Sequence, residues 1–132
     1  MLFYNVVFLP IDDAGKYGNI SYGTSLPYSL TAHCMVTLHD GRIMILGGFS
    51  PSTTHEKKVW IFNSTANSFT AGPNMIYSRS DHACALFLNP LTNNRSVLVA
   101  GGKSTSQVEL LEYETEGSTW VISKFLCLAL TI

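Results

Sequence analysis

The chain has 132 residues, of which 46% are hydrophobic and 13% charged, and its formal net charge is −1. A near-neutral chain without a basic stripe is not expected to bind nucleic acid, and no apolar stretch reaches the roughly 18–20 residues of a membrane span. Residues 1–9 are apolar, but they lack the basic start and small-residue cleavage site of a signal peptide. We therefore expect neither a nucleic acid nor a membrane as partner.

The first 30 residues divide into a segment without a clear pattern and a segment that returns later in the chain. Residues 1–16 predict no defined structure. Residues 17–30 align with a later segment at a spacing of 49, so that Gly23, for example, comes back as Gly72. This second segment is therefore predicted to be a strand and a linker that end an incomplete copy of a repeat.

Residues 31–80 form the first complete repeat. An Asp-Gly pair at positions 40 and 41 separates two apolar runs, and this sequence is typical of a hairpin turn. The second run ends in Ile-Leu-Gly-Gly at residues 45–48. We predict four strands in this repeat, over residues 33–38, 43–48, 59–63 and 68–72.

Residues 81–123 form the second repeat, in which Val-Ala-Gly-Gly stands at residues 99–102. The spacing from His33 to His82 is 49, whereas that from Gly47 to Gly101 is 54, so the first hairpin of the second repeat is five residues longer. Length varies in polar stretches, as expected if loops absorb insertions. We predict strands over residues 82–88, 97–102, 108–113 and 119–123.

A repeat of about fifty residues with short apolar runs and a double glycine has the period of a propeller blade. The fold class is therefore predicted to be all-β: about two four-stranded antiparallel blades of an incomplete β-propeller, preceded by the outer strand of another blade in residues 17–30. The continuous apolar runs at residues 42–46 and 96–100 suit strands that are covered on both faces. The positions that we align between the repeats, and to which we assign structural roles, are His33, Gly47, Gly48, Phe62, Phe69, His82, Gly101, Gly102, Tyr113 and Trp120.

These motifs resemble those of kelch repeat proteins. The family pattern has a strand leading into a double glycine, an aromatic residue followed by Asp or a relative, a Trp about seven residues later and an Arg before the next strand. Phe62-Asn63 and Tyr113-Glu114 fit the aromatic pair, Trp120 fits the Trp where the first repeat has Phe69, and Arg79 fits the arginine. The resemblance covers roughly residues 20–123. It implies a kelch-type β-propeller that serves as a protein–protein interaction scaffold or adaptor.

Two repeats are too few for a closed ring, because propellers have roughly four to eight blades. We therefore interpret the chain as a fragment of a larger propeller. On this interpretation the chain alone should form oligomers or aggregates through its uncovered blade faces. The apolar tail, residues 124–132, is interpreted as sequence foreign to the repeat, with an ordinary edge strand as the alternative.

The three cysteines, at positions 34, 84 and 127, have no Cys-x-x-Cys spacing. In the repeat alignment Cys34 corresponds to Ala83 and Cys84 to Met35, so we expect the two sulfurs to point to opposite faces of their strands. Reduced, buried cysteines are therefore predicted. They slightly favour the cytoplasm, but three Asn-x-Ser/Thr sequons at Asn19, Asn63 and Asn94 leave an extracellular location open.

The chain contains no catalytic motif of the serine hydrolase, P-loop or zinc protease type. His33 and His82 occupy the same repeat position, which strand packing explains better than a site does, and His55 is expected at the surface. We therefore predict no enzymatic activity, no metal and no cofactor. The alternative is a piece of a propeller enzyme similar to galactose oxidase, with its catalytic residues outside this chain.

An unknown protein partner is the remaining expectation, and the loops at one end of the blades are the predicted contact surface. These are the loops after the second strand of each repeat (residues 49–58 and 103–107) and the connection between the repeats (residues 73–81). Arg79 has an alternative role as a structural repeat residue. The predicted partner-binding residues are Ser50, Thr53, Thr54, His55, Lys57, Lys58, Tyr77, Arg79, Asp81, Lys103, Ser104, Thr105 and Gln107.

Overall fold

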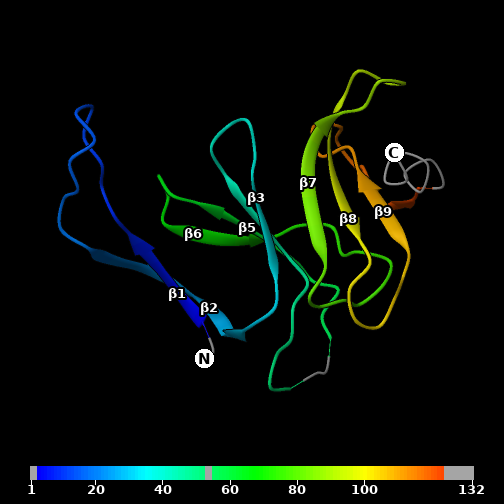
Figure 1. Ribbon diagram of the computed structural model, residues 1–132, viewed down its shortest axis with the longest axis horizontal. Coiled ribbons are helices and arrows are strands. Elements are labelled where there is room, and N and C mark those ends of the chain that lie inside the picture. The colour runs from blue at the N-terminus through cyan, green and yellow to red at the C-terminus, as the bar shows by residue number, and fades with distance from the viewer. Residues whose placement is uncertain (1–2, 53–54, 124–132) are drawn as a thin grey trace.

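The computed structural model describes residues 3–52 and 55–123, and it contains ten strands and no helix in those ranges (Figure 1). Blade 1 is a four-stranded antiparallel sheet in the order β3-β4-β5-β6. Its strands are Cys34–Thr37, Ile43–Leu46, Val59–Asn63 and Ser68–Ala71. Each lies within a predicted strand, so the prediction of a meander in residues 33–72 is confirmed.

Blade 2 repeats this architecture in the order β7-β8-β9-β10. Its strands are Ala83–Leu88, Arg95–Ala100, Val108–Leu111 and Val121–Ile122. In both blades the second strand ends directly before the double glycine, as predicted. The Asp-Gly turn also forms, with Gly41 at φ 87° between β3 and β4.

A two-stranded antiparallel sheet precedes the blades. It consists of β1 (Phe3–Phe8) and β2 (Ser21–Leu30), which we call the leading hairpin. Figure 1 shows the leading hairpin beside blade 1, on the side away from blade 2. Its two strands occupy the place of the third and fourth strands of a preceding blade, because β2 leads into β3 as β6 leads into β7.

The strand pairing corrects one part of the repeat alignment. Ile43 pairs with Phe62 in blade 1, and its counterpart four residues before the double glycine in blade 2, Val97, pairs with Leu111. Leu111 is therefore the structural equivalent of Phe62, and the predicted equivalence with Tyr113 is wrong. Strand β9 also ends at Leu111 rather than at residue 113, so that Tyr113 belongs to the turn that follows.

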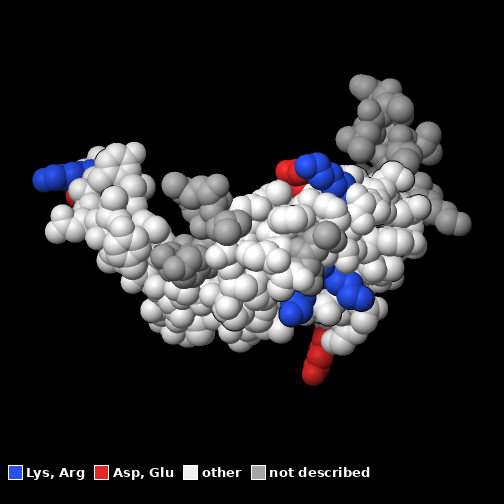
Figure 2. All heavy atoms as spheres, turned by 90° about the horizontal axis from the view of Figure 1, so that it is seen from below, with Lys and Arg blue, Asp and Glu red and all other residues white. Residues whose placement is uncertain are grey.

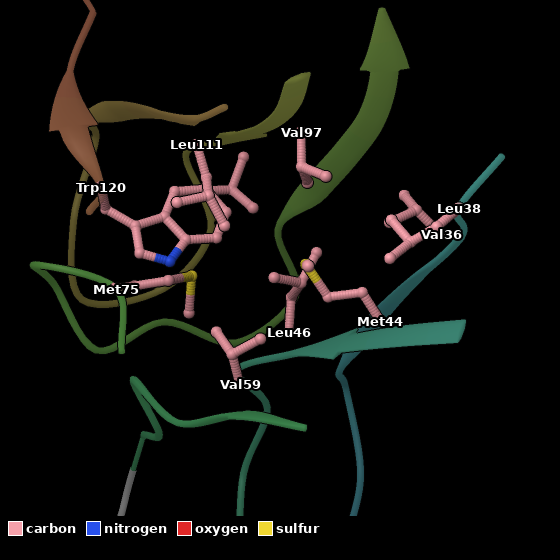
Figure 3. Packing of buried hydrophobic residues seen from close by; sticks show 10 residues of the cluster. Val36, Leu38, Met44, Leu46, Val59, Met75, Val97, Leu111 and Trp120 are labelled. Carbon is pink, nitrogen blue, oxygen red and sulfur yellow. The ribbon is translucent and has the colours of Figure 1, made fainter. Parts of the chain in front are cut away.

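The largest hydrophobic cluster lies between the two blades. Figure 3 shows side chains of both blades and of their linker packed together, with Trp120 beside Met75 and Leu111. The Trp120 indole Nε1 donates a hydrogen bond to the Pro73 carbonyl oxygen at 2.8 Å. The buried members of this cluster are Val36, Leu38, Met44, Leu46, Val59, Met75, Val97, Val99, Leu111 and Trp120. Burial of this apolar surface joins the blades.

A second, smaller cluster joins the leading hairpin to blade 1. Leu26 and Leu30 of β2 pack against Ile45 of β4, with Trp60 and Phe69 at the edge. The molecule therefore has two packed boundaries. Boundary 1 lies between the leading hairpin and blade 1, and boundary 2 lies between blade 1 and blade 2.

A disulfide joins Cys34 of β3 to Cys84 of β7, with their Cα atoms 6.1 Å apart, so the prediction of reduced cysteines is wrong for this pair. The physical reason lies in the repeat itself. When two blades pack together, one face of a strand in the first blade lies against the opposite face of the equivalent strand in the second blade. Two cysteines that point to opposite faces are thus brought together across boundary 2.

Candidate functional site

The connections between strands gather at two opposite ends of the blades. In an antiparallel meander, the turns after the first and third strands lie at one end and those after the second and fourth at the other. We call the end with residues 49–52, 55–58, 73–81 and 103–107 the lower rim, because it lies at the bottom of Figure 1. The end with residues 9–20, 38–42, 64–67 and 89–94 is the upper rim.

Backbone hydrogen bonds hold the three segments of the lower rim together. The Gly48 amide donates to the Arg79 carbonyl at 2.8 Å, and the Lys103 amide donates to the Ser80 carbonyl at 2.8 Å. Glu56 and Arg79 pair as an isolated antiparallel bridge. The linker between the blades is therefore fixed to the loop of blade 1 on one side and to the loop of blade 2 on the other.

Arg79 lies beneath this rim with no exposed surface. Its Nη1 donates to the carbonyls of Gly101 and Gln107 at 2.9 and 2.8 Å, and its Nη2 forms an ion pair with the fully buried Glu109. A buried charge is tolerated when it is paired and hydrogen-bonded. Arg79 is thus a structural residue, and it is removed from the set that can face a partner.

Glu109 is the partner of Arg79 that the sequence did not single out. Its carboxylate also accepts hydrogen bonds from the backbone amides of Ile76 and Tyr77. These three donors fix the linker in front of the second blade. Glu109 is the one charged residue of strand β9, and nothing in the sequence around it indicated this contact.

Ser50 is the second predicted partner-binding residue without exposed surface. Its hydroxyl donates to the Glu56 carboxylate at 2.8 Å inside the loop of blade 1. It therefore supports the shape of the loop instead of offering a contact. Thr53 and Thr54, also predicted here, lie outside the described residues.

The remaining predicted residues do lie at the surface of the lower rim. Lys57, Lys58, Ser104 and Gln107 are exposed, and Thr105 is half-buried. Figure 2, which views the molecule from below, shows charged side chains over the middle of this face.

Several of these exposed side chains are held by neighbours. The Lys58 ammonium lies 5.6 Å from the centre of the Tyr28 ring, and the Lys103 Nζ lies 3.0 Å from an Asp81 carboxylate oxygen. His55 is half-buried, with its Nδ1 3.0 Å from the Ser80 hydroxyl. Such contacts restrict the side chains before any partner binds.

The structure adds apolar residues to this surface that the sequence prediction missed. Phe49 is 40% exposed and Ile76 is 44% exposed, next to the predicted Tyr77 at 38%. The Phe49 ring packs edge-on against His55, with ring centres 5.8 Å apart. The sequence did contain a signal for these residues, because they are large apolar side chains inside polar loops. Such loops need no apolar side chain for their own folding.

Residues 31–76 match the family model that is described as the kelch motif. The chain carries a kelch repeat. The matched segment comprises blade 1 and the start of the linker, and the all-β architecture with sheets of two, four and four strands is that of an incomplete kelch-type propeller. No curated protein matched the chain.

The repeated histidines of the two blades lie directly under the double glycines. A Cβ added to Gly48 would lie 3.0 Å from the His33 Cβ, and one added to Gly102 would lie 2.8 Å from the His82 Cβ. Burial lowers the pKa of His33, and burial together with the weaker effect of the Arg79 charge lowers the pKa of His82 to about 4. The lowered pKa values favour the neutral form of both rings, which pack against the double glycines.

No group of three or more His, Cys, Asp and Glu side chains in residues 3–52 and 55–123 is arranged to hold a metal ion. The same part of the chain has no helix that could cross a membrane.

Proposed function

We propose that this chain is part of a kelch propeller that binds a partner protein through the lower rim. Protein binding is typical of kelch repeats, and the kelch motif in residues 31–76 supports that role at the level of the family. The observation that carries the proposal is the convergence of both loops and the linker on one face, with backbone bridges between them.

The side chains on this face have the chemistry of an interaction surface. Phe49, Ile76 and Tyr77 provide exposed apolar and aromatic area, and aromatic residues are enriched at interface hot spots. Lys57 and Lys58 provide adjacent positive charges, while Lys103 is paired with Asp81. A partner with apolar side chains flanked by acidic groups would match this pattern.

Charge reversal at the rim tests the proposal. Lys57→Glu reverses one exposed charge at the edge of blade 1, and Lys16→Glu, an equally exposed charge at the far end of the leading hairpin, is the matched control. Quantitative affinity purification from the native source should recover a set of proteins with the wild type and the control. The rim variant should recover it at least tenfold less.

A second readout separates binding from folding. The melting temperature of the rim variant should equal that of the control, because exposed charges contribute little to stability. Recovery of the same proteins by all three chains, at equal yield, would exclude the lower rim as the contact surface.

A further inference from the structure

The three glycosylation sequons of this chain lie on one rim, although they are far apart in sequence. Asn19 lies in the turn between β1 and β2, Asn63 at the turn between β5 and β6, and Asn94 in the turn between β7 and β8. These are turns of the upper rim, at the top of Figure 1. The sequons are therefore all on the side opposite to the lower rim.

The disulfide across boundary 2 is a second, independent observation that points to the same environment. Cys34 and Cys84 are 50 residues apart in sequence and come together only when both blades are folded and packed. Structural disulfides persist in oxidising compartments, which include the lumen of the endoplasmic reticulum and the extracellular space. Asparagine-linked glycans are added to proteins that enter this route.

We propose that the chain folds in the secretory route and carries N-linked glycans at Asn63 and Asn19, but not at Asn94. The donor class is a polyprenyl-pyrophosphate-linked oligosaccharide. A bond forms between Nδ2 of the asparagine and the first sugar carbon, while the bond from that carbon to the pyrophosphate oxygen breaks. The lipid pyrophosphate leaves, and the amide nitrogen loses one proton.

Asn63 is in a conformation that leaves its amide nitrogen available. Its Oδ1 accepts hydrogen bonds from the backbone amides of Thr65 and Ala66 at 3.0 and 3.1 Å. Both bonds use the oxygen, so Nδ2, the atom that takes the sugar, is not engaged by them. Ser64 and Thr65, which complete the sequon, are exposed. A glycan at this position would extend into solvent without disturbing the turn.

The surroundings of Asn63 leave room for the first sugar. An open hollow beside the asparagine is lined by the Asp40–Arg42 turn of the first hairpin and by residues 63–65. Arg42 and Asp40 form an exposed ion pair at 2.8 Å along its edge. Polar groups of this kind suit the hydroxyls of a sugar.

Asn19 shares the accessibility of Asn63. Every residue from Leu9 to Tyr22 is exposed, and the sequon serine, Ser21, begins β2. No packing against blade 1 has to be broken for a glycan to extend from this turn of the leading hairpin.

Asn94 differs from both, because its amide nitrogen is already used. Nδ2 donates to the Glu112 carboxylate at 2.9 Å, in a group that also holds Asn89 and Thr92. The sequon serine, Ser96, is fully buried, and its hydroxyl donates to the Asn94 carbonyl at 3.2 Å. A glycan on Asn94 would break these hydrogen bonds, so we expect Asn94 to stay unmodified.

Glycans at the upper rim would leave the lower rim uncovered, and only this consequence rests on the proposed function. Glycosylation itself is measured without any partner. A failure of the rim variant to change binding would therefore leave the glycan result intact, and the reverse also holds.

Mass spectrometry of the protein from its native source tests the proposal directly. Enzymatic removal of N-glycans in ¹⁸O-water converts each glycosylated asparagine into ¹⁸O-labelled aspartate. The label is expected at Asn63 and Asn19, with Asn94 unlabelled, and unreduced digests should contain the Cys34 and Cys84 peptides linked. Unlabelled Asn63, free thiols at both cysteines, or label at Asn94 would each overturn the proposal.

A pair of variants checks the Asn63 site in cells, with the full chain expressed behind a cleavable secretion signal. Thr65→Ala removes the sequon but keeps the Asn63 side chain and its bonds to the backbone, whereas Thr65→Ser keeps the sequon. Thr65→Ala should lose the mobility shift of one glycan, and Thr65→Ser should not. Equal mobility of the two secreted chains, before and after deglycosylation, would exclude Asn63 as a modified residue.

Discussion

The two packed boundaries of the molecule use the same repeat positions with different chemistry. Leu30 at boundary 1 and Arg79 at boundary 2 are 49 residues apart, and both are buried, at 1% and 0% exposure. The same spacing relates Trp60 to Glu109. An apolar residue and an indole at one boundary thus correspond to a buried ion pair at the other.

The two pairs form their hydrogen bonds by different means. At boundary 1 the Trp60 Nε1 donates to the Tyr28 hydroxyl at 2.9 Å. At boundary 2, Glu109 accepts from two backbone amides and from Arg79, which also serves two carbonyls. The pair at boundary 1 therefore uses one side-chain hydrogen bond, whereas the pair at boundary 2 uses several bonds to the backbone in addition to its ion pair.

The backbone, in contrast, is repeated closely. The bridge between Thr31 and Phe49 at boundary 1 corresponds to that between Ser80 and Lys103 at boundary 2. The residue that follows each linker bridge has a left-handed conformation, with φ 52° at Ala32 and 51° at Asp81. The linker geometry therefore defines the repeat, while the side chains that fill the two boundaries differ in polarity and charge.

The largest expected effect comes from breaking the ion pair at boundary 2. Arg79→Leu gives this position the residue found at boundary 1, but it leaves the Glu109 carboxylate buried without its cation. We expect a loss of about 3–5 kcal/mol in the free energy of unfolding. Urea unfolding followed by tryptophan fluorescence measures it. A loss below about 1 kcal/mol would mean that Glu109 has little need of Arg79.

The disulfide distinguishes boundary 2 from boundary 1, which has none among the described residues. Cys34→Ala introduces the residue that stands at the equivalent position of blade 2, Ala83. Loss of the cross-link should lower the free energy of unfolding by about 2–4 kcal/mol. Addition of a reductant should destabilise the wild type by a similar amount and leave the variant unchanged. Equal sensitivity of both chains to reductant would contradict this assignment.

The second glycine of each pair should be equally intolerant at the two boundaries. A Cβ at Gly48 would lie 2.7 Å from the Thr31 carbonyl oxygen, and one at Gly102 would lie 2.5 Å from the Ser80 carbonyl oxygen. Alanine at either position should cost about 2–3 kcal/mol through the clash and the positive φ. Gly101→Ala, which meets nothing within 4 Å, is the control and should cost about 1 kcal/mol. Similar losses at Gly101 and Gly102 would show that close approach of the linker is not the cause.

The smallest effect is expected at boundary 1. Trp60→Phe removes the hydrogen bond to Tyr28 but keeps most of the packed ring, so the loss should be about 1 kcal/mol. Tyr28→Phe should cost about as much, and the double variant little more than either. Additive losses would show that the two rings stabilise the boundary separately.

The strands and their order were predictable because they depend on local sequence. The Asp40–Gly41 turn, the apolar runs and the double glycines each predicted an element of blade 1 or blade 2 that the structure confirms. These signals extend over only a few residues, and the apolar runs and the double glycine occur in both repeats.

Contacts between blades were not predictable in the same way. The spacing from Tyr113 to Trp120 is seven residues, the same as that from Phe62 to Phe69, and this suggested the wrong alignment. Strand pairing places Leu111 opposite Val97, so the following turn in blade 2 is two residues longer. The disulfide depended on which faces of β3 and β7 meet. The burial of Ser50 depended on a loop that folds back onto Glu56. The role of the lower rim in binding stays a prediction.

A double-mutant cycle at boundary 2 tests most directly whether Arg79 and Glu109 act as one unit in place of the apolar pair of boundary 1. The free energies of unfolding of the wild type, Arg79→Leu, Glu109→Leu and the double variant would be compared. We predict that the double variant loses about as much as one single variant, which gives a coupling energy of about 3 kcal/mol. Losses that add within about 0.5 kcal/mol would contradict the account, because each side chain would then stabilise boundary 2 independently.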